Sequence, residues 1–185
     1  MTLDVTADST ADATSDVGRA VPTYSLPTRA ESSRRVVNMI NLSTPLGLAV
    51  ARVGGAAVTR GPRGTVLAAG YRYRFPRASA FTIGNVIISR MTLERLASRE
   101  RLLCHETRHC TQYAWCLGPV MLPAYGLAAG WSLVRTGDPA SRNIFERRAG
   151  LVDGGYVERP PRRPRWQRHR QRGQGDAAQR RDPEV

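Results

Sequence analysis

The sequence predicts an α+β domain that has a small sheet, one long helix and a helical hairpin, with a polar tail at each end. Two neighbouring stretches, 65–75 and 80–89, have the residue pattern of strands. A helical stretch follows over about 93–116, and the uncharged residues 114–134 come directly after it. With 185 residues the chain is long enough for one domain with a sizeable core.

Two polar segments border this domain, which we place at about residues 34–157. Residues 1–20 are rich in alanine, serine, threonine and aspartate, and the aspartates lie four apart, where like charges repel along a helix. Residues 159–185 contain nine arginines, four prolines and three acidic residues. Both segments have too few apolar side chains to fold alone, so we expect two disordered tails, one acidic and one arginine-rich.

The chain has a net charge of +13, and all of its 28 basic residues are arginine. Because the arginines are spread along the chain, a codon-biased, high-GC genome explains this composition as well as phosphate binding does. The C-terminal tail interleaves arginines with Trp166, which predicts attraction to nucleic acid or to an anionic surface at low salt. The candidate residues for this binding are Arg162, Arg163, Arg165, Arg168 and Arg170.

Cysteine usage and the first residues favour a cytoplasmic protein. Cys104, Cys110 and Cys116 are an odd number, and their spacing of six places them on different sides of a helix. They therefore predict neither a disulfide framework nor a shared metal, and a reducing compartment is the simpler interpretation. The first residues lack the basic and apolar regions of a secretory signal. Peripheral contact with a membrane stays open.

Local patterns predict the first elements in chain order. Residues 36–58 mix apolar runs with a proline and paired glycines, which indicates a helix followed by a turn. Residues 65–75, TVLAAGYRYRF, alternate aromatic residues with arginines like a half-buried strand. Residues 80–89, AFTIGNVIIS, are apolar and β-branched, and they predict a second strand.

A long helix is predicted after these strands. Thr92 can cap its start, and a break is expected near Ser98. The helix then runs to Trp115 or Cys116, because the Gly-Pro pair that follows stops a helix.

This helix carries an H-E-x-x-H motif, in which His105 and His109 lie one turn apart on the same face. Both imidazoles can therefore bind one metal ion, while Glu106 points about a third of a turn away, toward a metal-activated water. The motif predicts one Zn²⁺ per chain and a hydrolase with Glu106 as general base. The alternative is a buried helix on which the histidines form hydrogen bonds and Glu106 pairs with Arg101 or Arg108.

A hydrolytic zinc needs a third protein ligand, for which we predict Glu146. The other downstream candidates are His169, in the arginine-rich tail, and Asp138, in a Gly-Asp-Pro turn. Asn143 can cap a helix that holds Glu146 in its first turn, although the same spacing also fits a capping box in which the glutamate only binds the backbone. Asp153, seven residues on, is expected to orient a ligand histidine.

Residues 114–134 contain no charged side chain and are long enough to cross a bilayer. A crossing would leave His109 and Glu146 on opposite sides, about 30 Å apart, where they could not share a metal. The zinc hypothesis and a transmembrane span therefore exclude each other. We predict no span, and instead a buried helical hairpin that returns Glu146 to the histidines.

The same segments resemble a known family. AFTIGNVIIS, HETRHCTQY, GPVMLPAY and NIFERRA, within about residues 80–152, are similar to the zincin metallopeptidases, and in particular to small bacterial proteins with H-E-x-x-H-x-x-Q-Y and N-x-F-E-x-x-A. The resemblance implies a zincin-like domain with an edge strand beside the active-site helix, and the metal ligands and base named above. The chain departs from the family in the longer interval between His109 and Glu146, and in Gly150, where the family has an aspartate.

Three further residues are candidates for roles around the metal. Gln112 follows His109 by three residues, so it either contacts substrate or a ligand or is ordinary helix surface. Peptidases of this type often stabilise the oxyanion with a tyrosine, histidine or arginine. Tyr125 and Tyr113 are candidates for that catalytic role, with aromatic core packing as the alternative.

The sequence thus predicts a zinc-dependent metallopeptidase acting on a peptide or protein. Glu106 would activate a water and later pass its proton to the leaving amine. The edge strand within 80–89 can pair with an extended substrate by β-augmentation. Two alternatives stay open: a non-catalytic, metal-stabilised structural module, and a basic protein that binds nucleic acid through its arginine-rich tail.

Overall fold

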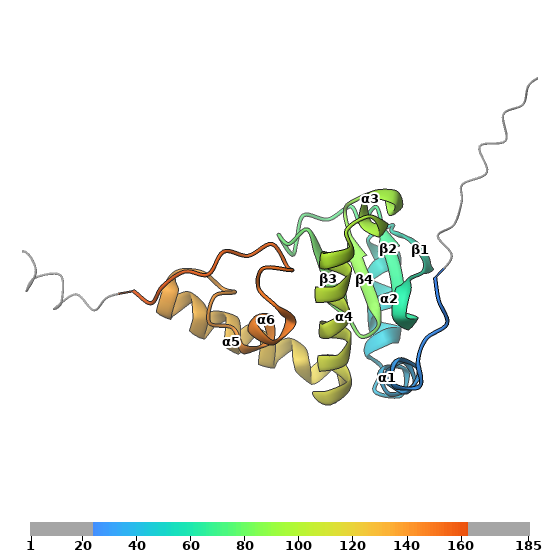
Figure 1. Ribbon diagram of the computed structural model, residues 1–185, viewed down its shortest axis with the longest axis horizontal. Coiled ribbons are helices and arrows are strands. Elements are labelled where there is room, and N and C mark those ends of the chain that lie inside the picture. Colours follow the sequence, from blue (N-terminus) through green and yellow to red (C-terminus); the bar gives the residue numbers. More distant parts are fainter. Residues whose placement is uncertain (1–23, 163–185) are drawn as a thin grey trace, which may run out of the picture.

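Figure 1 shows the computed structural model of the protein, which describes residues 24–162. The predicted α+β class is confirmed, because the described residues form six α-helices and one four-stranded sheet, whose strands all lie between α2 and α3 in the chain. In chain order the elements are α1 (Arg29–Ile40), α2 (Ser43–Val53), β1 (Ala57–Arg60), η1 (Pro62–Gly64), β2 (Val66–Ala69), β3 (Ala80–Ile83), β4 (Val86–Ser89), α3 (Leu93–Ala97), α4 (Glu100–Trp115), η2 (Gly118–Val120), α5 (Met121–Thr136) and α6 (Ile144–Ala149).

The described residues begin before the predicted domain boundary at 34, since α1 starts at Arg29 behind a capping box formed by Thr28 and Glu31. The predicted acidic tail, 1–20, lies outside the described residues, and so does the arginine-rich tail from 163 onward.

The sheet has the strand order β1-β2-β4-β3, with β2 parallel to β4 and the other neighbours antiparallel. β4 is an inner strand with all four residues buried, whereas β3 is an edge strand. The predicted single strand over 80–89 is instead a hairpin, because Gly84 adopts a φ of 63° in the turn between β3 and β4. A side chain at Gly84 would also collide with the backbone at the start of α2.

The predicted strand over 65–75 is wrong in its second half. β2 ends at Ala69, and residues 70–79 form no helix or strand. Tyr71 packs edge-on against Phe81, with ring centroids 5.4 Å apart, while Phe75 is largely exposed. The alternation of aromatic residues therefore marks a loop that packs on the edge strand.

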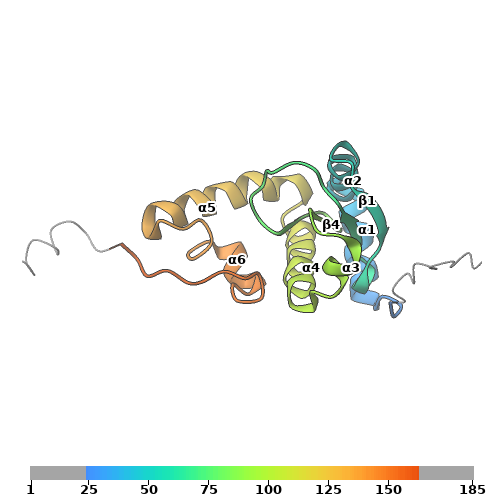
Figure 2. The same cartoon turned by 90° about the horizontal axis from the view of Figure 1, so that it is seen from above.

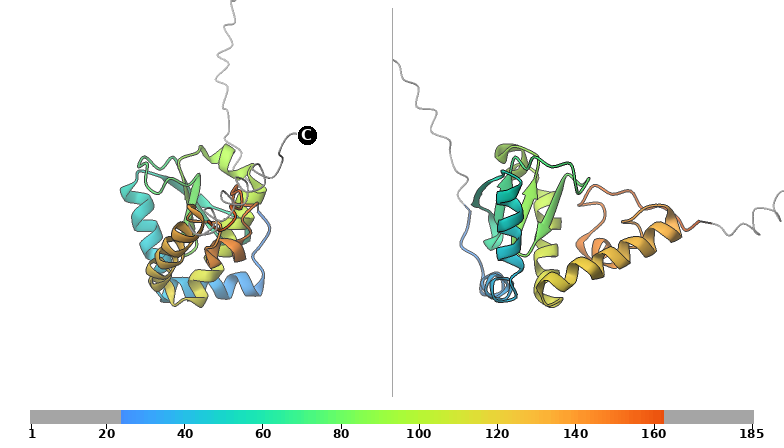
Figure 3. Two further views of the ribbon diagram at one scale, coloured as in Figure 1. Left: turned by 90° about the vertical axis from the view of Figure 1, so that its left-hand side faces the viewer. Right: turned by 180° about the vertical axis from the view of Figure 1, so that it is seen from behind.

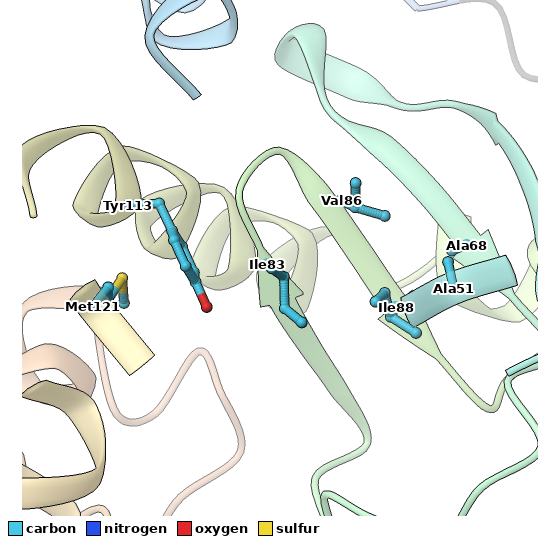
Figure 4. Packing of buried hydrophobic residues seen from close by; sticks show 7 residues of the cluster. All are labelled: Ala51, Ala68, Ile83, Val86, Ile88, Tyr113 and Met121. Atoms are coloured by element: carbon cyan, nitrogen blue, oxygen red, sulfur yellow. The ribbon is translucent and has the colours of Figure 1, made fainter. Parts of the chain in front are cut away.

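Helices cover both faces of the sheet, because successive strand residues point to opposite sides. Ala51 of α2 packs with Ala68 and Ile88, and this cluster continues round the edge strand to Tyr113 and Met121, as Figure 4 shows. On the other face, α3 and α4 pack against β2 and β4 through a second buried cluster that includes Leu67, Ile87, Leu96, Leu103 and Cys110.

The helix predictions were confirmed for the long helix. A break at Ser98 separates α3 from α4, and α4 ends at Trp115. The stretch 36–58, predicted as one helix and a turn, holds parts of two helices, α1 and α2, and the strand β1.

The predicted helical hairpin forms, but it is not buried. α5 projects from the body of the molecule, and α6 lies beside it and packs against α4 (Figures 1, 2 and 3). α5 has 16 residues and is about 24 Å long, whereas the six residues of α6 span about 9 Å. α6 is therefore too short to cover α5, and most of the α5 side chains face outward.

Within residues 24–162, no single helix is both long and apolar enough to cross a membrane. Two pairs of helices reach that length and composition only when they are added together across bends of 75° and 113°.

Candidate metal centre

Two helices bring the three predicted ligands together. α4 carries His105 and His109, α6 carries Glu146, and all three side chains are buried. The two Nε2 atoms are 3.1 Å apart, His105 Nε2 lies 3.3 Å from Glu146 Oε2, and His109 Nε2 lies 3.7 Å from Glu146 Oε1. Three potential ligand atoms thus surround one point.

These distances fit a tetrahedral zinc ion. Zinc bonds of 2.0–2.2 Å to nitrogen and oxygen place neighbouring ligand atoms about 3.3–3.6 Å apart in a tetrahedron. The three measured separations, 3.1, 3.3 and 3.7 Å, lie around this range. Within the described residues, this is the one group of at least three histidine, cysteine or carboxylate side chains that is arranged to hold a metal ion.

The hydrogen bonds of His105 fix its tautomer. Its Nδ1 lies 3.1 Å from the carbonyl oxygen of Ala149 and 2.9 Å from that of Gly150. Because a carbonyl oxygen only accepts hydrogen bonds, Nδ1 carries the proton and Nε2 presents a lone pair to the centre.

His109 is fixed in the same way by Gln112. The Gln112 Nε2 donates to the carbonyl oxygen of Phe145 at 2.9 Å, which turns Oε1 toward His109 Nδ1, 2.8 Å away. Nδ1 therefore donates to Gln112, and Nε2 presents a second lone pair. Gln112 thus contacts His109, one of the predicted ligands, and it also ties α4 to the residue before Glu146.

When both imidazoles are neutral, the centre consequently gathers negative charge and lone pairs without a proton between them. The two Nε2 lone pairs face each other at 3.1 Å, and Glu146 Oε2 is buried without a hydrogen-bond donor among the described residues. Buried acceptors that face one another destabilise a protein unless a donor or a cation lies between them. The donor set therefore fits a metal cation better than it fits a packed helix face.

The capping-box alternative for Glu146 is wrong. Asn143 caps α6 by accepting a hydrogen bond from the Phe145 backbone N–H, but its own backbone N–H donates to Ala140. The Glu146 carboxylate turns inward instead, where the Tyr125 hydroxyl donates to Oε1.

Glu106 lies beside the three ligands and is buried. Thr82, on the edge strand β3, donates its hydroxyl hydrogen to Glu106 Oε2 at 2.7 Å. Burial raises the pKa of Glu106, and the hydrogen bond from Thr82 opposes this shift. The predicted alternative was a pair of Glu106 with Arg101 or Arg108, and the pair with Arg108 is not formed, because Arg108 binds Asp153.

The prediction for Asp153 was wrong. Its carboxylate accepts a hydrogen bond from Arg108 Nη1 at 2.7 Å and is partly exposed, so it does not orient a histidine. Residues 150–155 form turns after α6, which carry Asp153 off the helix face that the prediction assumed. The histidine partner is the backbone of Ala149 and Gly150, and Gly150 is the position at which the resembled family has an aspartate.

A cavity of about 380 Å³ opens beside the centre. Its polar end consists of the two histidines, Glu106 and Glu146, and β3 forms one wall. The rest of the lining is mainly apolar and aromatic, and includes Phe75, Phe81, Met121 and Leu122. Both candidate tyrosines line it, but Tyr113 belongs to the buried core cluster and Tyr125 binds Glu146.

Sequence reasoning missed two residues of this site. Thr82 was part of a predicted strand, but only the packing of β3 on α4 reveals its bond to Glu106. Tyr156 also lines the cavity, with its ring centroid 6.1 Å from that of His105. Burial and the charge of Glu146 raise the pKa of Tyr156, so its hydroxyl stays protonated at neutral pH. The paired glycines 154–155 were the available signal, because Gly154 packs directly against the His105 ring.

Of the five candidate arginines of the tail, the structure describes Arg162, whose backbone N–H donates to the carbonyl oxygen of Arg135 at 2.8 Å. Arg163, Arg165, Arg168 and Arg170 lie outside the described residues, so binding of nucleic acid through them stays a prediction.

Comparison of the chain with protein-family models, with curated proteins and with solved structures found no match. The chemistry of the centre is therefore inferred from its own geometry.

Proposed function

We propose that the protein is a zinc-dependent hydrolase, with His105, His109 and Glu146 as metal ligands and Glu106 as general base. The observation that supports this most directly is the pair of imidazoles with fixed tautomers, whose Nε2 lone pairs point at each other beside a buried carboxylate. Two nitrogen ligands and one carboxylate are typical of catalytic zinc sites, which keep a fourth position for water or substrate.

Zinc in such a site acts as a Lewis acid that polarises a carbonyl group and lowers the pKa of water toward neutrality. The protein supplies the proton transfer. Glu106 lines the cavity beside the ligands, and Thr82 holds its carboxylate in place. It can take a proton from the attacking water and deliver it to the leaving group, and its raised pKa favours the protonated state between these steps.

A peptide is the substrate class that we propose. β3 is the edge strand of the sheet, contacts α4 and forms a wall of the cavity, so an extended peptide can add to it as a further strand. An edge strand beside the helix of an H-E-x-x-H motif, with a glutamate from a later helix, is also the arrangement implied by the resemblance to zincin metallopeptidases. Tyr125 and Tyr156 line the same cavity and are candidates to donate a hydrogen bond to an oxyanion.

Metal content is the first test. Elemental mass spectrometry of the purified full-length protein is expected to find about one zinc per chain, and much less in His109→Ala and in Glu146→Ala. His169→Ala is the matched control, because it removes the one histidine that lies outside the centre. A wild-type protein that carries no zinc, and binds none on titration, would contradict the proposal.

Peptide cleavage is the second test. A library of peptides incubated with the zinc-loaded protein is expected to yield products, and Glu106→Gln is expected to keep the zinc and lose the cleavage. A protein that binds zinc but cleaves nothing would instead be a metal-stabilised structural module.

A further inference from the structure

The outer face of α5 is apolar and exposed. Leu127, Trp131 and Val134 lie one turn apart on this face and are 78%, 61% and 71% exposed. No charged side chain occurs between Met121 and Arg135. An exposed apolar stripe of this kind marks a surface that another molecule covers.

Arginines gather at the outer end of this stripe. The Arg135 guanidinium lies 5.4 Å from the centroid of the Trp131 ring. The backbone of Arg162 bonds to the carbonyl of Arg135, and the backbone of Arg142 bonds to the Ser132 hydroxyl of α5. Arg135 and Arg142 are exposed, and Arg162 is exposed as well.

The carboxylates nearest to this end already have partners. Asp138 accepts hydrogen bonds from the backbone N–H groups of Ala140 and Ser141 and from the Ser141 hydroxyl. Glu158 pairs with Arg147 at 2.6 Å. In the sequence, Arg162 is followed directly by the segment RPRWQRHRQR, which contains further arginines. The stripe is therefore bordered by positive charge with little acidic compensation.

We propose that the outer face of α5 binds the surface of an anionic lipid bilayer. The apolar side chains would enter the boundary between headgroups and acyl chains, where tryptophan is favoured, while the arginines contact lipid phosphates. α5 lies in the plane of the surface and does not cross it. An excess of arginine over free carboxylate favours an anionic membrane over a second copy of this chain, because the copy would bring the same positive charge.

Vesicle flotation of the full-length protein tests this. The protein is expected to float with vesicles of phosphatidylcholine and phosphatidylglycerol, and much less with phosphatidylcholine alone. The triple variant Leu127→Ser, Trp131→Ser, Val134→Ser is expected to bind the anionic vesicles on the order of tenfold more weakly, because three apolar side chains no longer enter the bilayer. Wild type that stays unbound at low salt would overturn the proposal.

A matched control removes the same number of exposed apolar side chains outside α5. Val36, Ile40 and Val53 are 58%, 76% and 73% exposed on α1 and α2. Changing all three to serine is expected to leave vesicle binding unchanged. Circular dichroism of both triple variants checks that they fold, and equal weakening in the two would contradict a specific role of α5.

The fluorescence of Trp131 gives a readout that does not depend on affinity. In full-length protein with Trp115→Phe and Trp166→Phe, Trp131 is the remaining tryptophan. Its emission is expected to shift to shorter wavelength with anionic vesicles and to be quenched by brominated lipids. If vesicles bind without either change, the apolar face of α5 does not enter the bilayer and the proposal fails.

Two alternatives to this proposal, membrane binding through the tail alone and self-association through α5, give distinct results. A full-length variant with Arg163, Arg165, Arg168 and Arg170 changed to glutamine is expected to bind more weakly and still to depend on the α5 stripe. If this variant loses all binding while the α5 triple variant binds like wild type, membrane binding belongs to the tail alone and the proposal fails. Sedimentation that shows a wild-type dimer and a monomeric triple variant, without vesicle binding, would make the stripe a self-association surface.

Discussion

Helices α4 and α5 both have 16 residues, but they place polar and apolar side chains in opposite ways. α4 buries His105, Glu106 and His109 among its core residues. α5 buries few residues and exposes Leu127 and Trp131. Buried polar groups and exposed apolar stripes are both departures from ordinary globular packing. In the two proposals above, each departure marks a site for another species, a metal ion at α4 and a membrane surface at α5.

The largest effect is expected from a substitution that removes the proposed general base on α4 and keeps the packing of the helix. Glu106→Gln keeps the size of the side chain but cannot take a proton, so peptide cleavage should fall by about 10²- to 10⁴-fold while zinc content stays constant. Cleavage rates at saturating zinc, with elemental analysis of each sample, check this. A variant as active as wild type would mean that Glu106 is not the base.

The same apolar truncation should have different effects on the two helices. Leu103→Ala, in the buried face of α4, should lower the free energy of unfolding by about 2–5 kcal/mol, because it leaves a cavity in the core. Leu127→Ala, on the outer face of α5, should change it by less than about 0.5 kcal/mol. Urea unfolding of both variants measures the difference, and similar values would remove the contrast between the helices.

A smaller effect is expected from Gln112, which holds His109 in place through a hydrogen bond. Gln112→Ala removes the acceptor that fixes the His109 tautomer, and should weaken zinc binding by about 10- to 100-fold. Competition with a chelator measures the affinity. Thr111→Ala is the matched control, because Thr111 is the exposed neighbour of Gln112 on α4 and lies outside the centre. Equal affinities in the two variants would show that Gln112 does not support the site.

The smallest effect concerns the turn that ends α5. Partial burial opposes ionisation of Asp138, but hydrogen bonds from Ser141 and Ala140 outweigh it and lower its pKa. Asp138 therefore stabilises the fold above its unfolded pKa of about 3.9, and this contribution is lost as the pH falls through the lower folded pKa. Thermal unfolding between neutral and acid pH should show a smaller loss of stability in Asp138→Asn than in wild type. An identical pH dependence would contradict the assignment.

The parts of the site that follow from helical period could be predicted from sequence. His105, Glu106 and His109 share one helix, so their spacing fixes their relative placement. Glu146 was identified because few other ligands occur downstream and Asn143 marks the start of its helix. The break at Ser98 and the end of α4 at Trp115 were equally local.

The remaining features depend on contacts between distant segments. Thr82 reaches Glu106 because β3 packs on α4, and no pattern within the strand indicates this bond. The partner of His105 was misassigned to Asp153, since a backbone carbonyl has no residue type by which a sequence could reveal it. The exposure of α5 was missed for a similar reason, because an apolar helix is expected to be buried unless its neighbour is known to be short.

The backbone acceptors of His105 also affect which substitutions the sequence can tolerate during evolution. An aspartate partner is lost by a single codon change, whereas the carbonyl oxygens of Ala149 and Gly150 belong to every possible residue. Selection at these two positions therefore acts on the shape of the turn, where Gly150 has a φ of 88°, and not on a functional side chain. Descendants of this chain can exchange the side chain at 149 for another small residue and still orient the histidine.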